Sequence, residues 1–105
     1  MRIVIGDRTW SELEAVEAER LRQERLKREG RFSYTLADDE MPDGMKLAAL
    51  LEEVAEVGKN LLAREGLVTD GDTSLDAIHK ELSQVAALSV AWMENITTLR
   101  DAGQV

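Results

Sequence analysis

The sequence contains no cysteine, a single proline and only four aromatic residues. Without cysteine the chain forms neither disulfide bonds nor thiolate metal sites. Basic residues are also few, 13 against 21 acidic ones, which gives a formal net charge of −8. Nucleic acids and anionic membranes attract a positive surface, so neither is an expected partner. The apolar run near Met1 is far too short for a signal peptide or a membrane span, and we expect a cytoplasmic protein.

The abundant residues are Leu, Ala, Glu and Arg, a composition that favours an all-α fold. Helical patterning covers three stretches, at about residues 10–29, 44–65 and 73–100. The 105 residues are expected to form one domain. This domain would be a small bundle of three to four helices, with a core so limited that oligomerisation is expected to complete it.

The expected starts of the helices rest on capping pairs. Thr9 with Glu12, and Thr73 with Asp76, have the spacing at which a hydroxyl and a carboxylate satisfy free backbone N–H groups. Residues 1–8 precede the first pair and are β-prone. We therefore predict an extended arm there, followed by the first helix.

The predicted helix 44–65 carries two glutamates, Glu53 and Glu56, beside a broad apolar arc. At about 100° per residue, the arc comprises Leu47, Leu50, Leu51, Val54, Val57, Gly58, Leu61 and Leu62. Glu53 lies at the edge of this arc, and Glu56 is one step further out. The pair therefore flanks the face that is expected to pack into the core.

On the predicted helix 73–100, Glu81 falls inside the apolar arc itself, and Gln84 and Asn95 lie together on its edge. The apolar members are Ile78, Leu82, Val85, Leu88, Trp92, Ile96 and Leu99. An ionised carboxylate taken out of water needs a cation, a strong donor or a raised pKa.

Two interpretations of Glu81 stay open. It reaches solvent or pairs with an arginine of the first helix, such as Arg20 or Arg22. Alternatively, the oxygen-bearing residues on the two antiparallel helices share a divalent cation. Residues three apart lie on one helix face, and three carboxylates with an amide oxygen suit Mg²⁺ or Mn²⁺.

The run Glu53-Val-Ala-Glu56, followed by Glu81-Leu-Ser-Gln84, resembles the ExxE…ExxD signature of MazG-like nucleotide pyrophosphohydrolases, the all-α NTP pyrophosphatase superfamily. Flanking segments are similar to a subgroup found in actinobacteria and their phages: AERLRQE (18–24), MPDG (41–44) and ELSQVAALSVAWMENI (81–96). The resemblance implies a Mg²⁺-dependent enzyme that cleaves a (d)NTP between the α and β phosphates, giving NMP and pyrophosphate. It also implies a homodimer or homotetramer.

Matched residue by residue, the resemblance implies a metal site formed by Glu53, Glu56, Glu81 and Gln84, for Mg²⁺ with Mn²⁺ as a substitute. Glu53 or Glu56 would accept the proton of the attacking water. Gln84 stands where the family has aspartate, and the lost negative charge is expected to weaken metal binding. This departure keeps an alternative open: a non-catalytic MazG-like helical protein that binds a nucleotide or a protein partner.

A triphosphate substrate also needs cations and polar contacts. Four residues of the predicted helices are candidates for substrate binding: Arg20, Arg22, Lys46 and Asn95.

Overall fold

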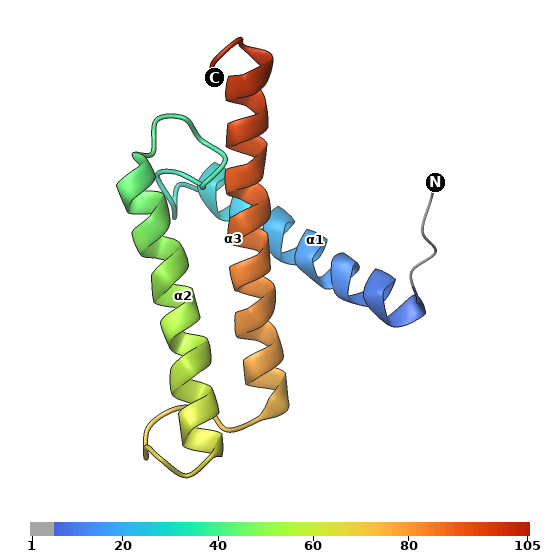
Figure 1. Ribbon diagram of the computed structural model, residues 1–105, viewed down its shortest axis with the longest axis vertical. Helices are drawn as coiled ribbons and strands as arrows, with labels where there is room; N and C mark the ends of the chain where they lie inside the picture. The colour runs from blue at the N-terminus through green and yellow to red at the C-terminus, as the bar shows by residue number, and fades with distance from the viewer. Residues whose placement is uncertain (1–5) are drawn as a thin grey trace.

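The computed structural model describes residues 6–105, which form three helices joined by two connecting segments (Figure 1). The helices are α1 (Asp7–Arg28), α2 (Asp43–Arg64) and α3 (Leu75–Asp101). α2 and α3 lie side by side and antiparallel as a hairpin, and α1 crosses behind α3 in this view. The described residues contain no strand, which confirms the predicted all-α class with three helices in this part of the chain.

The start of α1 differs from the prediction. The helix begins at Asp7, after Gly6 as N-cap, and no side chain caps its first turn. The predicted capping box of Thr9 and Glu12 is therefore wrong, because both residues lie within the helix. The predicted arm 1–8 is helical from Asp7 onward, and its first five residues lie outside the described part of the chain.

The start of α3 also differs, by one residue. Ser74, and not Thr73, is the N-cap, and its Oγ accepts a hydrogen bond from the backbone N–H of Ala77 at 3.1 Å. Serine and threonine both cap helices well, so the one-residue shift keeps a hydroxyl at the start of the helix. The ends of α1 and α2 agree with the prediction: Gly30 and Gly66, with φ of 76° and 77°, close them in the left-handed conformation.

The inward face of α2 is not the predicted apolar arc. Its buried side chains are Lys46, Val57, Asn60 and Ala63, and Glu53 is half-buried between them. Glu53 therefore lies in the middle of the inward face and not at its edge. Most of the predicted arc instead points away from the core and is 41–56% exposed, namely Leu47, Leu51, Val54, Leu61 and Leu62.

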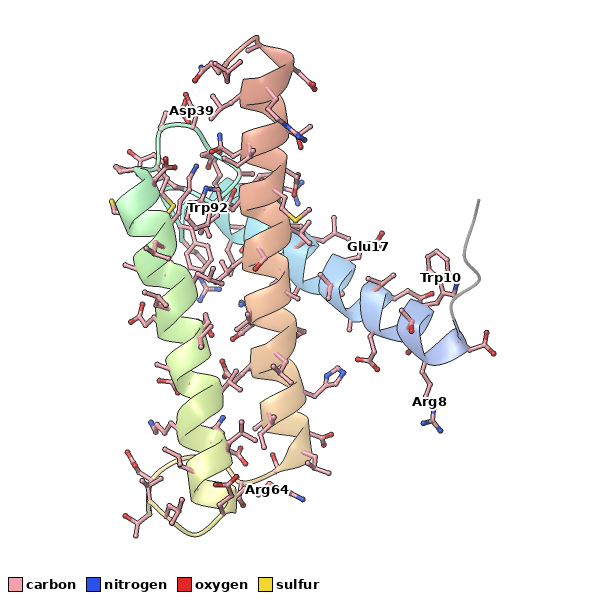
Figure 2. All side chains as sticks on the ribbon, viewed as in Figure 1. Arg8, Trp10, Glu17, Asp39, Arg64 and Trp92 are labelled. Atoms are coloured by element: carbon pink, nitrogen blue, oxygen red, sulfur yellow. The ribbon has the colours of Figure 1, made fainter. Side chains whose placement is uncertain are left out.

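On α3 the centre of the core is formed by small side chains. Ala87 and Ala91 are completely buried, whereas Leu82 and Ile96 of the predicted arc are exposed. Small residues allow helices to approach closely, so α3 packs against both α1 and α2. Figure 2 shows Trp92 in the space between α2 and α3, and Trp10 projecting from the far end of α1.

The connector between α1 and α2 is held against the helices. The Asp38 carboxylate accepts hydrogen bonds from Lys27 Nζ at 2.7 Å and from the Thr35 backbone N–H at 2.8 Å. Thr35 Oγ1 donates to Glu24 at 3.1 Å, and Leu36 is buried beside it. The connector is thus fixed over the hairpin, where it forms one wall of the cavity described below.

The molecule is open for its length. Its radius of gyration is 15.9 Å, compared with about 13 Å for a compact domain of this size. Its accessible surface is 7698 Å² for a mass of 11.7 kDa, whereas roughly 5,900 Å² is typical of a folded monomer of that mass. Within residues 6–105, no helix has an apolar stretch long enough to cross a membrane.

Candidate metal and nucleotide site

Three of the four predicted metal ligands meet between α2 and α3. The Gln84 side-chain amide, oriented to satisfy its surroundings, donates to Glu53 Oε2 and to Glu81 Oε2, both at 2.9 Å. The two carboxyl groups are also hydrogen-bonded to each other. Glu53, Glu81 and Gln84 are called the carboxylate cluster below. It is present because the middle of α2's inward face lies opposite the face of α3 that carries Glu81 and Gln84.

The surroundings of Glu53 raise the pKa of its carboxyl group from an ordinary 4.5 to about 7. Burial is the main cause, because it disfavours the charged form. The hydrogen bond to Glu81 and the negative charges of Glu81, Glu56 and Glu52 act in the same direction. Near neutral pH, Glu53 is therefore partly protonated, at a place where a bound cation would instead stabilise its negative charge.

We expect the proton on Glu53 to make stability depend on pH. The folded chain binds it more tightly than the unfolded chain, so the contribution is complete below pH 4.5 and is lost as the pH rises through about 7. After allowance for partial exposure, the free energy of unfolding should fall by about 1–2 kcal/mol over this interval. Urea unfolding at a series of pH values measures the change.

Two variants separate this effect from other titrations. Glu53→Gln removes the titrating group and should flatten the profile between these pH values. Glu14→Gln, on the exposed face of α1, should keep the wild-type profile. Identical profiles for wild type and Glu53→Gln would contradict the assignment.

Glu56, the fourth predicted ligand, lies outside the carboxylate cluster. Its side chain is about half exposed, with Oε2 4.0 Å from Lys59 Nζ. It lines a hollow of about 470 Å³ together with Glu81, at the end of the hairpin that carries the loop between α2 and α3. Among residues 6–105, no group of three or more His, Asp or Glu side chains is arranged to hold a metal ion. The sequence-predicted set is therefore brought together only in part.

The predicted substrate-binding residues Lys46 and Asn95 are buried and contact each other. Lys46 Nζ donates to Asn95 Oδ1 at 2.5 Å, and the side chains are 1% and 2% exposed. Asp43 Oδ1 is 4.0 Å from the same Nζ. Lys46 is seven residues, or about two helical turns, from Glu53 on α2. Lys46 and Asn95 thus contact each other and do not reach the surface beside the carboxylate cluster.

The two predicted arginines lie in different places. Arg20 Nε donates to Glu94 at 2.7 Å, which ties α1 to α3. Arg22 binds Glu19 with hydrogen bonds of 2.8–3.2 Å and lines a small hollow of about 90 Å³ together with Glu53 and Gln84. Glu19, and to a lesser extent Glu53, raise the pKa of Arg22. Arg22 is therefore the predicted cation that lies beside the carboxylate cluster, and neither arginine pairs with Glu81.

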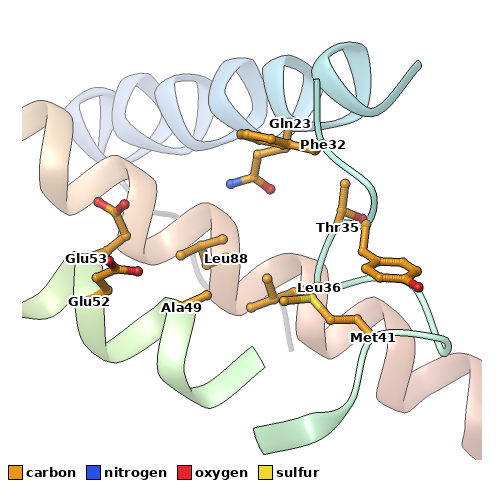
Figure 3. Close-up of a pocket in the computed structure, with 10 residues that line it drawn as sticks. Gln23, Phe32, Thr35, Leu36, Met41, Ala49, Glu52, Glu53 and Leu88 are labelled. Atoms are coloured by element: carbon orange, nitrogen blue, oxygen red, sulfur yellow. The ribbon is translucent and has the colours of Figure 1, made fainter. Parts of the chain in front are cut away.

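A cavity of about 310 Å³ adjoins the carboxylate cluster, and apart from Glu53 its lining residues were missed by the sequence-based prediction (Figure 3). Gln23 of α1 and two connector residues, Phe32 and Tyr34, line it, and Glu53 forms one end. The connector lacks helical periodicity, so no helical projection could direct its side chains to a site. The available signal was composition, because two of the four aromatic residues of the chain, Phe32 and Tyr34, lie two positions apart in this short segment.

Comparisons with known proteins add no relative. No protein-family model, curated protein or solved structure matches this chain. The resemblance to the MazG-like family therefore depends on the signature and flanking segments of the sequence.

Proposed function

We propose that this chain is a Mg²⁺-dependent pyrophosphohydrolase that cleaves a (d)NTP between its α and β phosphates, releasing NMP and pyrophosphate. One observation carries the proposal: Glu53 and Glu81, which come from antiparallel helices, meet at the side-chain amide of Gln84 and lie beside a cavity. Carboxylate and amide oxygens are the ligands that Mg²⁺ prefers. The raised pKa of Glu53 supports a fit to a cation, because burial and the neighbouring carboxylates disfavour its charged form and a cation would stabilise it.

In this proposal each residue of the site has a defined task. Glu53 and Glu81 hold the ion, and Gln84 contributes its amide oxygen after its side chain rotates. Bound Mg²⁺ would neutralise phosphate oxygens and lower the pKa of a water. Glu56, next along the same helix face, accepts the proton when the water oxygen bonds to phosphorus and the bond to the bridging oxygen breaks. Arg22 offers its guanidinium to the departing pyrophosphate.

One observation favours the alternative, a MazG-like helical protein that binds a nucleotide or partner without turnover. Gln84 donates to both carboxylates at once, which satisfies them without any cation. An aspartate at this position would instead add a third negative charge. The glutamine thus supports a site with lower metal affinity, and turnover decides between the two functions.

A product analysis tests the proposal. The protein is incubated with each ribo- and deoxyribonucleoside triphosphate and Mg²⁺ or Mn²⁺, and the products are separated by anion exchange. We expect NMP and pyrophosphate in equal amounts from at least one substrate, and no NDP. A folded sample that turns over none of them would favour the binding protein, and NDP with orthophosphate would indicate a different hydrolase.

A second copy of the chain is the proposed partner, bound through the outer hairpin face. This face consists of the exposed apolar residues Leu47, Leu51, Val54, Leu61 and Leu62 of α2, with Met93 and Ile96 of α3. A groove of about 340 Å³ between the two helices, lined by residues including Leu50 and Trp92, is continuous with it. Two hairpins that pair these faces would form a four-helix bundle.

The area available matches such a dimer. The accessible surface exceeds that of a typical monomer by roughly 1,800 Å², and obligate homodimers bury roughly 1,000–2,500 Å² per chain. The cavities beside the carboxylate cluster are lined partly by α1 and the connector, whereas the groove is lined by α2 and α3 alone. The dimer would therefore cover the apolar face and leave the site open.

A further inference from the structure

The cavity beside the carboxylate cluster has an aromatic rim and a mainly apolar lining. Phe32 and Tyr34 are each 42% exposed, so one part of each ring faces solvent and another faces the cavity. Ala49 and Leu88 line it from α2 and α3, as Figure 3 shows. Glu53 stands at one end, so a ligand that fills the cavity lies next to the cluster.

One polar group in this cavity has no partner. Gln23 extends from α1 into the cavity (Figure 3), is 5% exposed, and its side-chain oxygen makes no hydrogen bond within residues 6–105. Buried amide oxygens are normally hydrogen-bonded, because they lose water on folding. Gln23 also lines the small hollow beside Gln84 and Arg22, so it borders both spaces next to the carboxylate cluster. Its position indicates a ligand that supplies the missing donor.

We propose that this cavity binds the base of a nucleotide and that Gln23 reads the hydrogen-bonding edge of that base. A side-chain amide presents a donor next to an acceptor, which matches the adjacent acceptor and donor on a base edge. Phe32 and Tyr34 supply ring surfaces on which a base can stack. A base held there directs its phosphates toward Glu53 at the end of the cavity. The direction of the phosphates rests on the proposed hydrolase function, whereas binding of the base does not.

Binding of nucleosides without phosphate or metal tests the base site by itself. Dissociation constants are measured for adenosine, guanosine, cytidine and uridine with wild type, Gln23→Leu, Phe32→Ala and Gln104→Leu. Wild type should bind one nucleoside at least about tenfold more tightly than the others. Gln23→Leu should remove this preference, and Phe32→Ala should weaken all four by about fivefold or more. Gln104→Leu, near the exposed C-terminus, is the matched control and should behave as wild type.

Thermal unfolding shows whether the variants remain folded. Gln23→Leu should be at least as stable as wild type, because it removes an unsatisfied buried polar group. The proposal is overturned if wild type binds no nucleoside, if it binds all four equally, or if the preference survives in Gln23→Leu. Nucleoside binding without NTP turnover would refute the hydrolase and keep the base site. NTP turnover without nucleoside binding would refute the base site and keep the hydrolase.

Discussion

Glu53→Gln and Glu81→Gln are each expected to lower the rate of NTP hydrolysis by about 100-fold or more, because each removes a carboxylate ligand of the proposed ion. Glu56→Gln should reduce the maximal rate by a similar factor, about 10²–10⁴-fold if it is the general base. The three variants should differ in metal dependence. Glu53→Gln and Glu81→Gln should need more Mg²⁺ for half-maximal activity, whereas Glu56→Gln should not.

Steady-state rates measured over a range of Mg²⁺ concentrations check this pattern. Glu14→Gln is the matched control, since it removes an exposed carboxylate from α1. The cluster variants should stay folded, because each relieves the repulsion between Glu53 and Glu81. Near wild-type activity in Glu81→Gln would contradict the proposed role of Glu81 as a metal ligand. An unchanged Mg²⁺ requirement in both Glu53→Gln and Glu81→Gln would exclude the carboxylate cluster as the metal site.

If the proposed dimer forms, Leu51→Glu is expected to convert it into a monomer. Leu51 is 56% exposed on the outer hairpin face, and a two-fold interface would contain the substitution twice. Losing about 1.5–3 kcal/mol of apolar burial per leucine, with the added cost of confining two carboxylates, should raise the dimer dissociation constant by at least about 100-fold. Sedimentation equilibrium of wild type and variant measures this constant.

Leu67→Glu provides the matched control for this experiment. Leu67 is 68% exposed in the loop between α2 and α3, outside the outer hairpin face. It should leave the association state unchanged. A wild-type chain that sediments as a monomer of 11.7 kDa, or a Leu51→Glu variant that dimerises as wild type does, would show that the outer face has another purpose.

The sequence predicted the helices and offered a site shared by the second and third helices as one of two interpretations of Glu81, but it did not predict which face of α2 is buried. The three-residue spacing of Glu53 and Glu56, and that of Glu81 and Gln84, is a local property of each helix, and the fold preserves it. The direction of the core is not local. Leu51 and Leu62 lie in the predicted apolar arc and are nevertheless exposed. An apolar periodicity marks an apolar helix face, but it does not tell whether that face packs into the core or lies on the outside.

Two features of the site could not be derived from helical patterns. Lys46 and Asn95 have side chains of the kind that usually lies on the surface, and only the three-dimensional structure shows that each buries the other. Gln23 lies on a helix whose other residues are mostly charged, so its burial follows from the position of the connector. Both result from contacts between residues distant in sequence.

The hydrogen bond between Lys46 and Asn95 also sets the helical register of the hairpin. Shifting α2 along α3 by one turn, about 5.4 Å, would break this bond and leave two buried polar groups without partners. The same shift would carry Glu53 away from Glu81 and Gln84. The apolar inward residues of α2, such as Ala63, disfavour such a shift less strongly, because a small apolar side chain can pack against many different neighbours on α3. The contact between Lys46 and Asn95 lies about two turns from Glu53 along α2 and about four turns from Glu81 along α3. It makes one alignment of the helices better than its neighbours, and in that alignment the carboxylates meet.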